Sequence, residues 1–262
     1  GLLGKLLGPA GLVATSAAAG DLPPRMLALL ALNDLVWWIP FGLFLLEGRS
    51  IGARIRGAAP YACAVLHAAA GAAMLLVLRA GTEAEADPAA RAAYIRGHAA
   101  AWRLGFGVWM AAGMSVLGFY AWWGARARAS RLALLALAAA GAGVACDLVG
   151  EALYAGWLPW LASEVAAGAP GALARFSAVQ RLGTVLTAVF ANGLYTVAGI
   201  VLTLATPQLP RTVRALAWVA WAAGVLLAVA GLLGRADAMV AASAVLFPAL
   251  VCLCLAVGRR LR

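Results

Sequence analysis

Seven long apolar runs dominate the chain, and short polar segments separate them. The runs are continuous rather than alternating, which is typical of helices and not of the strands of a membrane barrel. Each is long enough to cross the roughly 30 Å hydrocarbon core of a bilayer, which takes about 20 helical residues. The pattern therefore predicts an all-α, polytopic transmembrane helix bundle of seven spans, at about residues 26–46, 58–79, 98–123, 132–156, 179–205, 212–233 and 237–258.

Residues 1–20 precede the first run and are harder to assign. They are mildly apolar, but Lys5, Gly8, Pro9 and Gly11 interrupt them. Such a segment could be an interfacial helix, the remnant of a signal region or a short eighth span. We predict a peripheral or interfacial segment over residues 1–22, followed by a seven-helix transmembrane domain over residues 23–262.

The loops between the runs alternate in charge. Arginines gather after the first, third, fifth and seventh runs, whereas the other loops hold acidic residues and fewer arginines. Because cytoplasmic loops carry the excess of positive side chains, the N-terminus is predicted outside and the C-terminus inside a bacterial-type inner (plasma) membrane. The arginines that set this orientation are Arg49, Arg54, Arg56, Arg126, Arg128, Arg131, Arg211, Arg214, Arg259, Arg260 and Arg262.

Composition agrees with a membrane location and excludes other classes. The chain is 65% hydrophobic and 11% charged, where a soluble domain has about 25% charged residues. Its net charge of +10 is divided among four short loops, so no nucleic-acid partner is predicted, since that would need one basic face. The four cysteines fall inside predicted spans without a C-x-x-C motif, and we expect free, buried thiols.

Tryptophans near the ends of the spans are predicted at the membrane interface. Trp122 and Trp123 close the third run, and Trp157 and Trp160 follow the fourth. Aromatic belts of this kind mark both surfaces of a bilayer, because the ring is apolar and its N–H is polar.

Polar side chains inside the spans are the candidates for function, because burying them in lipid is costly. Asp147 and Glu151 are four residues apart and share a helix face, with Tyr154 next on the same side. Counted at about 1.5 Å per residue, the ionisable groups of four spans all fall in the outer half of the membrane. The candidate ligand-binding residues are Asn33, Asp34, Trp37, Trp38, Arg103, Asp147, Glu151, Tyr154, Arg181, Asn192 and Tyr195.

Two interpretations of this cluster stay open on the sequence alone. The charges could neutralise one another in a closed network of salt bridges that fixes helix packing. Alternatively, they could line an outward-facing polar cavity, with walls formed by Trp37, Trp38, Trp102 and Tyr154. We favour the cavity, since intramembrane charges usually mark functional sites.

Histidines raise the question of haem, because paired histidines on membrane helices hold iron in many cytochromes. His67 lies deep in the second predicted span and His98 lies at the start of the third, so their depths differ by roughly 18 Å. We therefore predict no cofactor and no metal, and keep haem b with His67 and His98 as a lesser alternative. A retinal protein is excluded, since the seventh run contains no lysine for a Schiff base.

The leading functional hypothesis is non-enzymatic binding or passage of a small polar or amphiphilic molecule. Asp34, Asp147 and Glu151 would accept the ligand or a proton, and Arg103 and Arg181 would be counter-charges. A second hypothesis is an intramembrane enzyme that modifies a lipid or isoprenoid, with Asp147 and Glu151 as an acid/base pair. A third is an accessory subunit of a larger membrane complex. Expected partners are thus the lipid bilayer, a small-molecule or lipid ligand and other membrane subunits.

Overall fold

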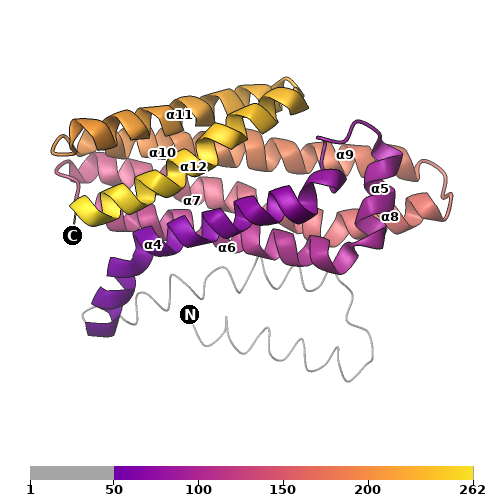
Figure 1. The fold of residues 1–262 in the computed structure, drawn as a ribbon, viewed down its shortest axis with the longest axis horizontal. Helices are drawn as coiled ribbons and strands as arrows, with labels where there is room; N and C mark the ends of the chain where they lie inside the picture. Colours follow the sequence, from indigo (N-terminus) through magenta and orange to yellow (C-terminus); the bar gives the residue numbers. More distant parts are fainter. Residues whose placement is uncertain (1–49, 262) are drawn as a thin grey trace. The chain divides into compact units, whose positions relative to one another are not determined.

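The computed structural model describes residues 50–261, and within that range the chain is helical apart from short connections (Figure 1). This confirms the predicted all-α fold and a bundle of membrane-spanning helices. The predicted span 26–46, the segment 1–22 and four candidate residues lie outside the described residues. Those four are Asn33, Asp34, Trp37 and Trp38.

The helical elements of residues 50–261 follow one another in chain order. The elements are α4 (Ser50–Ala73), η2 (Met74–Leu78, π), η3 (Arg79–Gly81, 3-10), α5 (Pro88–Gly97), α6 (Ala99–Gly124), α7 (Ser130–Ala152), η4 (Leu153–Trp157, π), α8 (Leu158–Ala166), α9 (Ala172–Thr184), η5 (Val185–Ala191, π), α10 (Asn192–Ala205), α11 (Arg211–Leu232) and α12 (Ala236–Arg260).

Residues 50–261 thus comprise nine α-helices, three π-helical segments and one 3-10 turn.

Six helical stretches in the described part of the chain are long and apolar enough to cross a membrane. Four of them agree with the predicted spans to within a few residues. The other two, Arg131–Ala166 and Ala172–Ala205, continue past the predicted ends at residues 156 and 179. At about 1.5 Å per residue, a 36-residue helix is longer than the roughly 30 Å apolar core, so one end projects beyond it. The six stretches are Gly57–Gly81, Ala99–Gly124, Arg131–Ala166, Ala172–Ala205, Arg211–Leu232 and Ala236–Arg260.

Local sequence explains why the fourth span is longer than predicted. Pro159 lies in the first turn of α8, where the missing N–H leaves no helical bond unmade. The helix therefore continues past this proline to Ala166. The chain reverses only at Gly168 and Gly171, whose φ angles of 70° and 69° suit glycine.

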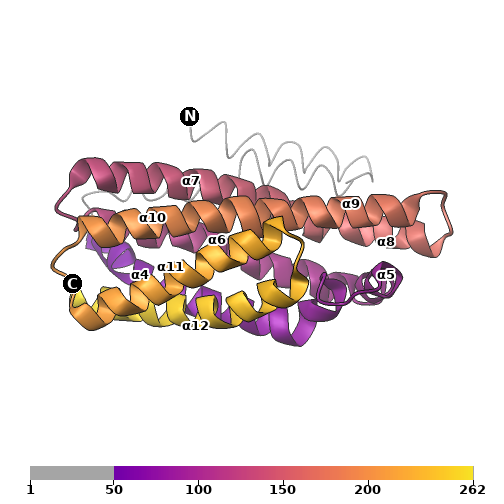
Figure 2. The same cartoon turned by 90° about the horizontal axis from the view of Figure 1, so that it is seen from above.

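Helices α5, α8 and α9 meet at one end of the bundle, which we name the α5 end (Figures 1 and 2). Helix α5 was not predicted, although Asp87 provides a typical start: its side chain accepts a hydrogen bond from the Ala89 N–H at 2.9 Å. A small apolar core joins this end to the spans. Its buried residues are Leu78, Ala92, Ile95, Trp102, Phe106, Tyr154, Leu158, Leu161, Ala162 and Phe176.

The main apolar core lies toward the opposite end, which we name the C-terminal end because α12 finishes there (Figure 1). Trp122 and Trp123, predicted at the membrane interface, lie in the last turn of α6 with both rings buried in this core, so they do not face lipid. The Trp123 N–H instead donates to Thr206 Oγ1 at 3.0 Å. Trp157 and Trp160 are about half exposed, as interfacial side chains would be.

Glycine allows a close helix contact in the main core. Gly199 of α10 lies against the ring of Trp221 in α11, so that a Cβ atom there would overlap the indole carbons. The Trp221 N–H also donates to Thr203 Oγ1 at 2.9 Å, one turn further along α10. The hydrogen bond to Thr203 therefore fixes the indole beside its contact with Gly199.

We predict that Gly199→Ala destabilises the protein by about 1–3 kcal/mol, because the indole cannot move without breaking its hydrogen bond. Gly193→Ala in the same helix is the matched control, since a Cβ atom there meets nothing within 4 Å. The measurement is the thermal unfolding midpoint of both variants in lipid nanodiscs. Equal midpoints for the two variants would contradict this packing.

Candidate functional site

A cavity of about 540 Å³ lies between α4 and η2 on one side and α12 on the other. Its remaining walls come from α6, α7, η5, α10 and α11. This volume is within the range of about 300–1,000 Å³ that is usual for small-molecule sites. The cavity therefore has room for a ligand of moderate size inside the membrane-spanning part of the bundle.

The cavity is closed toward the C-terminal end. There α4 and α12 approach closely, because Gly258 has no side chain to separate its helix from Pro60. Tyr120, Trp221 and Leu250 belong both to the cavity wall and to the main core, so they form its floor. Figure 1 shows α4 and α12 diverging from this crossing toward the α5 end.

Two carboxylates on one face of α7 line the cavity. Asp147 and Glu151 are both buried, with 9% and 2% of their surface exposed. Asp147 Oδ2 accepts a hydrogen bond from the Tyr195 hydroxyl at 3.0 Å. Glu151 Oε2 is buried and has no hydrogen-bond partner among the described residues. The structure thus brings together three sequence-predicted residues, and leaves one carboxylate oxygen unpaired.

A glycine makes room for the Asp147 carboxylate. A Cβ atom at Gly113 of α6 would lie 2.7 Å from Asp147 Oδ2, closer than a carbon and an oxygen can approach without bonding. A side chain at residue 113 would therefore displace the Asp147 carboxylate from its present position.

A hydrogen-bonded chain connects the cavity wall to its rim at the α5 end. The hydroxyl groups of Tyr154 and Thr184 form a hydrogen bond of 2.7 Å, and Thr184 Oγ1 donates to Glu83 Oε2 at 2.9 Å. All three residues line the cavity. Asn192 also lines it, and its amide donates to the Gly224 carbonyl at 2.7 Å, which ties α10 to α11.

His67 lines the cavity from α4, and His98 does not. His67 Nδ1 lies 2.9 Å from the Cys63 carbonyl, which requires a proton on Nδ1 and leaves Nε2 as an acceptor. His98 is exposed at the junction of α5 and α6, where its ring stacks on Tyr94 at 4.3 Å. No group of three metal-binding side chains occurs among the described residues. The haem-ligand role of both histidines stays a prediction.

The two arginines proposed as counter-charges lie elsewhere. Arg103 is exposed on α6 and is not a cavity-lining residue. Arg181 donates from Nη2 to the carbonyl of Leu232, the last residue of α11, at 3.1 Å. It therefore caps a helix C-terminus, where a positive charge is favourable. Within residues 57–261, no ion pair joins either arginine to Asp147 or Glu151.

Trp102 is also placed apart from the cavity. It is fully buried in the small core at the α5 end, and its N–H donates to the Tyr154 carbonyl at 2.7 Å. Tyr154 itself lies between that core and the cavity. Trp102 and Tyr154 were both predicted to form the aromatic walls, and of these two Tyr154 lines the cavity.

All three π-helical segments contribute to the cavity wall. Met74 and Leu75 come from η2, Tyr154 from η4, and Thr187 and Ala188 from η5. A π segment widens a helix turn and shifts the side chains that follow, and such segments are frequent at functional sites. Sequence periodicity alone does not locate them, because it assumes regular α-helical turns.

Several cavity residues were not among the sequence-predicted ones. Glu83 lies in a loop, and Trp109 and Phe247 have the appearance of ordinary core aromatics in the sequence. Their rings meet edge to face across α6 and α12 with centroids 5.1 Å apart. The available signal was the acidic loop that contains Glu83, but its fold back onto Thr184 depends on tertiary contacts.

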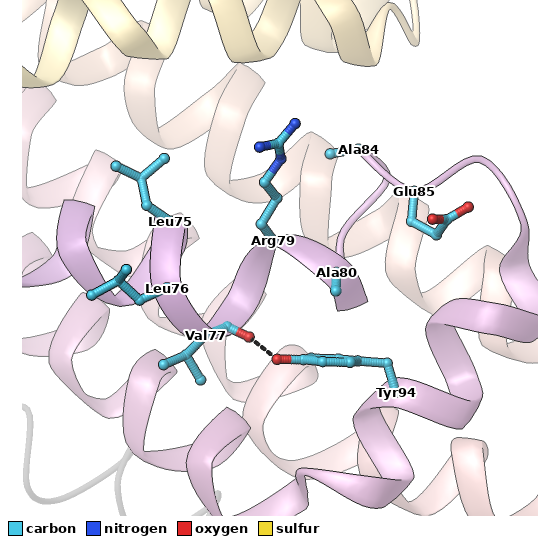
Figure 3. A pocket seen from close by; sticks show the side chains of 8 residues that line it. All are labelled: Leu75, Leu76, Val77, Arg79, Ala80, Ala84, Glu85 and Tyr94. Carbon is cyan, nitrogen blue, oxygen red and sulfur yellow. Dashed lines mark hydrogen bonds between the residues drawn. The ribbon is translucent and has the colours of Figure 1, made fainter.

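A second hollow, of about 330 Å³, lies beside the η2–η3 turn (Figure 3). The Tyr94 hydroxyl donates there to the Val77 carbonyl. Arg79 lines both hollows, and in Figure 3 its guanidinium points past Ala84, away from the Glu85 carboxylate. The Tyr94 hydroxyl is already bonded, and none of the buried side-chain polar atoms without a partner in the described residues lines this hollow, so we regard the larger cavity as the candidate site.

No family model, no curated protein and no solved structure matches this chain. The geometry of the cavity is therefore the basis for inferring a function.

We predict that water reaches the cavity. Ser243→Cys, on the cavity wall, should react with a charged, water-soluble thiol reagent about tenfold faster than Val245→Cys, because a thiol surrounded by lipid does not ionise. Val245 is 48% exposed on the same helix and does not line the cavity. The labelling rate is measured by mass spectrometry with Cys146 and Cys252 replaced by alanine. Equal rates at the two positions would mean a dry cavity.

Proposed function

We propose that this protein binds a small amphiphilic molecule within the membrane, in the cavity between α4 and α12. One observation carries the proposal: Glu151 places an unpaired carboxylate oxygen in the wall of a cavity large enough for a ligand. The lining is otherwise mostly apolar and aromatic with a few polar groups, which is the usual composition of a small-molecule site.

Energetics favour this proposal over a purely structural role for the carboxylates. A buried ionisable group stabilises packing only when a partner compensates its desolvation. Asp147 has Tyr195 as a hydrogen-bond donor, whereas the described part of the chain supplies no partner for Glu151 Oε2. A bound polar group would provide the missing interaction.

The closed floor supports binding rather than passage in this conformation. Tyr120, Trp221 and Leu250 separate the cavity from the C-terminal end, and the rim residues Arg79 and Glu83 lie at the α5 end. A ligand would thus enter and leave from the α5 end or between η2 and α12.

Charge favours an orientation with the α5 end outside the cell. Within residues 57–261, the connections at the C-terminal end carry arginines and no acidic side chain, whereas the α5 end holds Glu83, Glu85, Asp87, Glu164 and Asp237. By the distribution of positive residues, the C-terminal end would face the cytoplasm of a bacterial-type inner membrane. The cavity would then open outward.

Filling the cavity should remove binding. Gly71 lines it, and a Cβ atom there meets nothing within 4 Å, so Gly71→Leu adds a side chain without a clash. We expect the wild type to bind at least one of three amphiphiles saturably, and Gly71→Leu to lose that binding. The three amphiphiles, which share a ten-carbon chain, are decyltrimethylammonium, 1-decanol and decanoate. Binding of radiolabelled probes to the protein in nanodiscs is the measurement.

Gly107→Leu is the matched control for this substitution. Gly107 is exposed on α6, does not line the cavity and also has open space at its Cβ position. It should bind like the wild type. The proposal fails when none of the three amphiphiles binds saturably, or when both leucine variants bind equally.

Orientation can be tested separately with single cysteines in the turns. Ala167 is exposed between α8 and α9, and Ala125 is exposed after α6. We expect a membrane-impermeant thiol reagent to label Ala167→Cys in intact cells, and to label Ala125→Cys only after the cells are opened. The reverse result would place the cavity rim in the cytoplasm.

A further inference from the structure

We infer that the ligand carries a positive charge: an amphiphilic amine or quaternary ammonium whose cationic group lies beside Glu151 and Asp147. This inference rests on the proposed function and adds the chemical class of the ligand.

The charges along the cavity wall are arranged for a cation. Asp147 and Glu151 are buried, and among the described lining residues the one arginine is Arg79. Arg79 is exposed at the rim, where water screens its charge (Figure 3). A cation that passes the rim therefore meets two carboxyl groups and no further arginine or lysine in the described wall.

Hydrogen-bond donors in the wall are mostly occupied, which disfavours an anion. The Tyr195 hydroxyl donates to Asp147, the Asn192 amide to Gly224, and the Thr187 hydroxyl to the Gly183 carbonyl. Trp109 Nε1 is a buried donor without a partner in the described residues. One neutral N–H does not compensate the loss of water around an anionic group.

Acceptors, by contrast, remain free. Glu151 Oε2 has no partner in the described part of the chain. Pro248 has no N–H to donate to the carbonyl of Ala244, four residues earlier in α12, and both residues line the cavity. An ammonium group could donate hydrogen bonds to acceptors on two helices, Glu151 on α7 and Ala244 on α12.

Aromatic rings surround the same space. Trp109 and Phe247 meet at 5.1 Å, and Phe106 stacks on Tyr154 at 4.7 Å. The electron-rich faces of such rings attract cations, and most strongly where water is excluded. A quaternary ammonium, which has no N–H to donate, would be held by this attraction together with the carboxylates.

The apolar part of the ligand has its own surface. Met74, Leu75, Met239 and Val240 line the cavity between η2 and α12, and Leu75 is 70% exposed. Because this wall continues onto the exposed apolar face of the bundle, an alkyl chain could extend from the carboxylates toward lipid. These features together define a cationic head and an apolar tail.

The test compares decyltrimethylammonium, 1-decanol and decanoate, which share a ten-carbon chain and differ in charge. Specific binding is the difference between the wild type and Gly71→Leu in nanodiscs. We expect the cation to bind at least about tenfold more tightly than decanol, and decanoate to bind weakest. Glu151→Gln should lose this preference, with decanol binding unchanged.

Two further variants separate charge from folding. Glu151→Gln replaces the carboxyl by a neutral amide of the same shape and should fold at least as well as the wild type. Glu151→Asp should retain part of the preference for the cation, and Glu164→Gln, outside the cavity, should retain all of it.

The outcomes distinguish this inference from the proposed function. When decanol or decanoate binds as tightly as the cation, or when Glu151→Gln leaves cation binding unchanged, the inference that the ligand is cationic is wrong. The proposed amphiphile site is not affected by that result. When no probe shows binding that Gly71→Leu removes, the site itself is wrong.

Discussion

The hydrogen-bonding demand of buried polar groups organises this bundle, because lipid offers no partner to a polar atom. In the main core several buried donors find partners on neighbouring helices: Trp123 donates to Thr206, Trp221 donates to Thr203, and the Tyr120 hydroxyl donates to the Tyr195 carbonyl. Glu151 combines two features: one of its buried carboxylate oxygens has no partner among the described residues, and the residue lines a cavity with room for a ligand. This combination is the reason to treat its surroundings as a binding site and not as one more packed contact.

Packing and cavity depend on where the helices can approach. Gly199 brings α10 against Trp221, which is part of the cavity floor, and Gly258 brings α12 against Pro60 at the closed end. Above the floor, three π segments interrupt the regular turns of helices that line the cavity. Close packing at one end and widened turns along the walls together leave the space between α4 and α12.

The α5 end has a role in holding the rim of this space. Helices α5, α8 and α9 enclose a small apolar core, and the Gln180 amide of α9 donates to the Gly81 carbonyl at 2.8 Å. The Thr184 hydroxyl one turn later donates to Glu83. The loop that contains Gly81 and Glu83 and borders the cavity is thus fixed by two side chains of α9. The part of this long helix that extends beyond the apolar core therefore also positions the rim.

The sequence by itself determined the helical class and the bounds of four of the six described spans to within a few residues, since apolar runs of membrane length have few alternatives. It also placed Asp147, Glu151 and Tyr154 on one face, because the i,i+4 spacing is a local property of a helix. Tertiary structure alone decided that Tyr195 meets Asp147, that Glu83 folds back onto Thr184, and that Arg103 and Arg181 lie outside the cavity. Depth along a helix follows from counting residues, but rotation toward a neighbour depends on the packing of all the helices and on π segments that periodicity does not reveal.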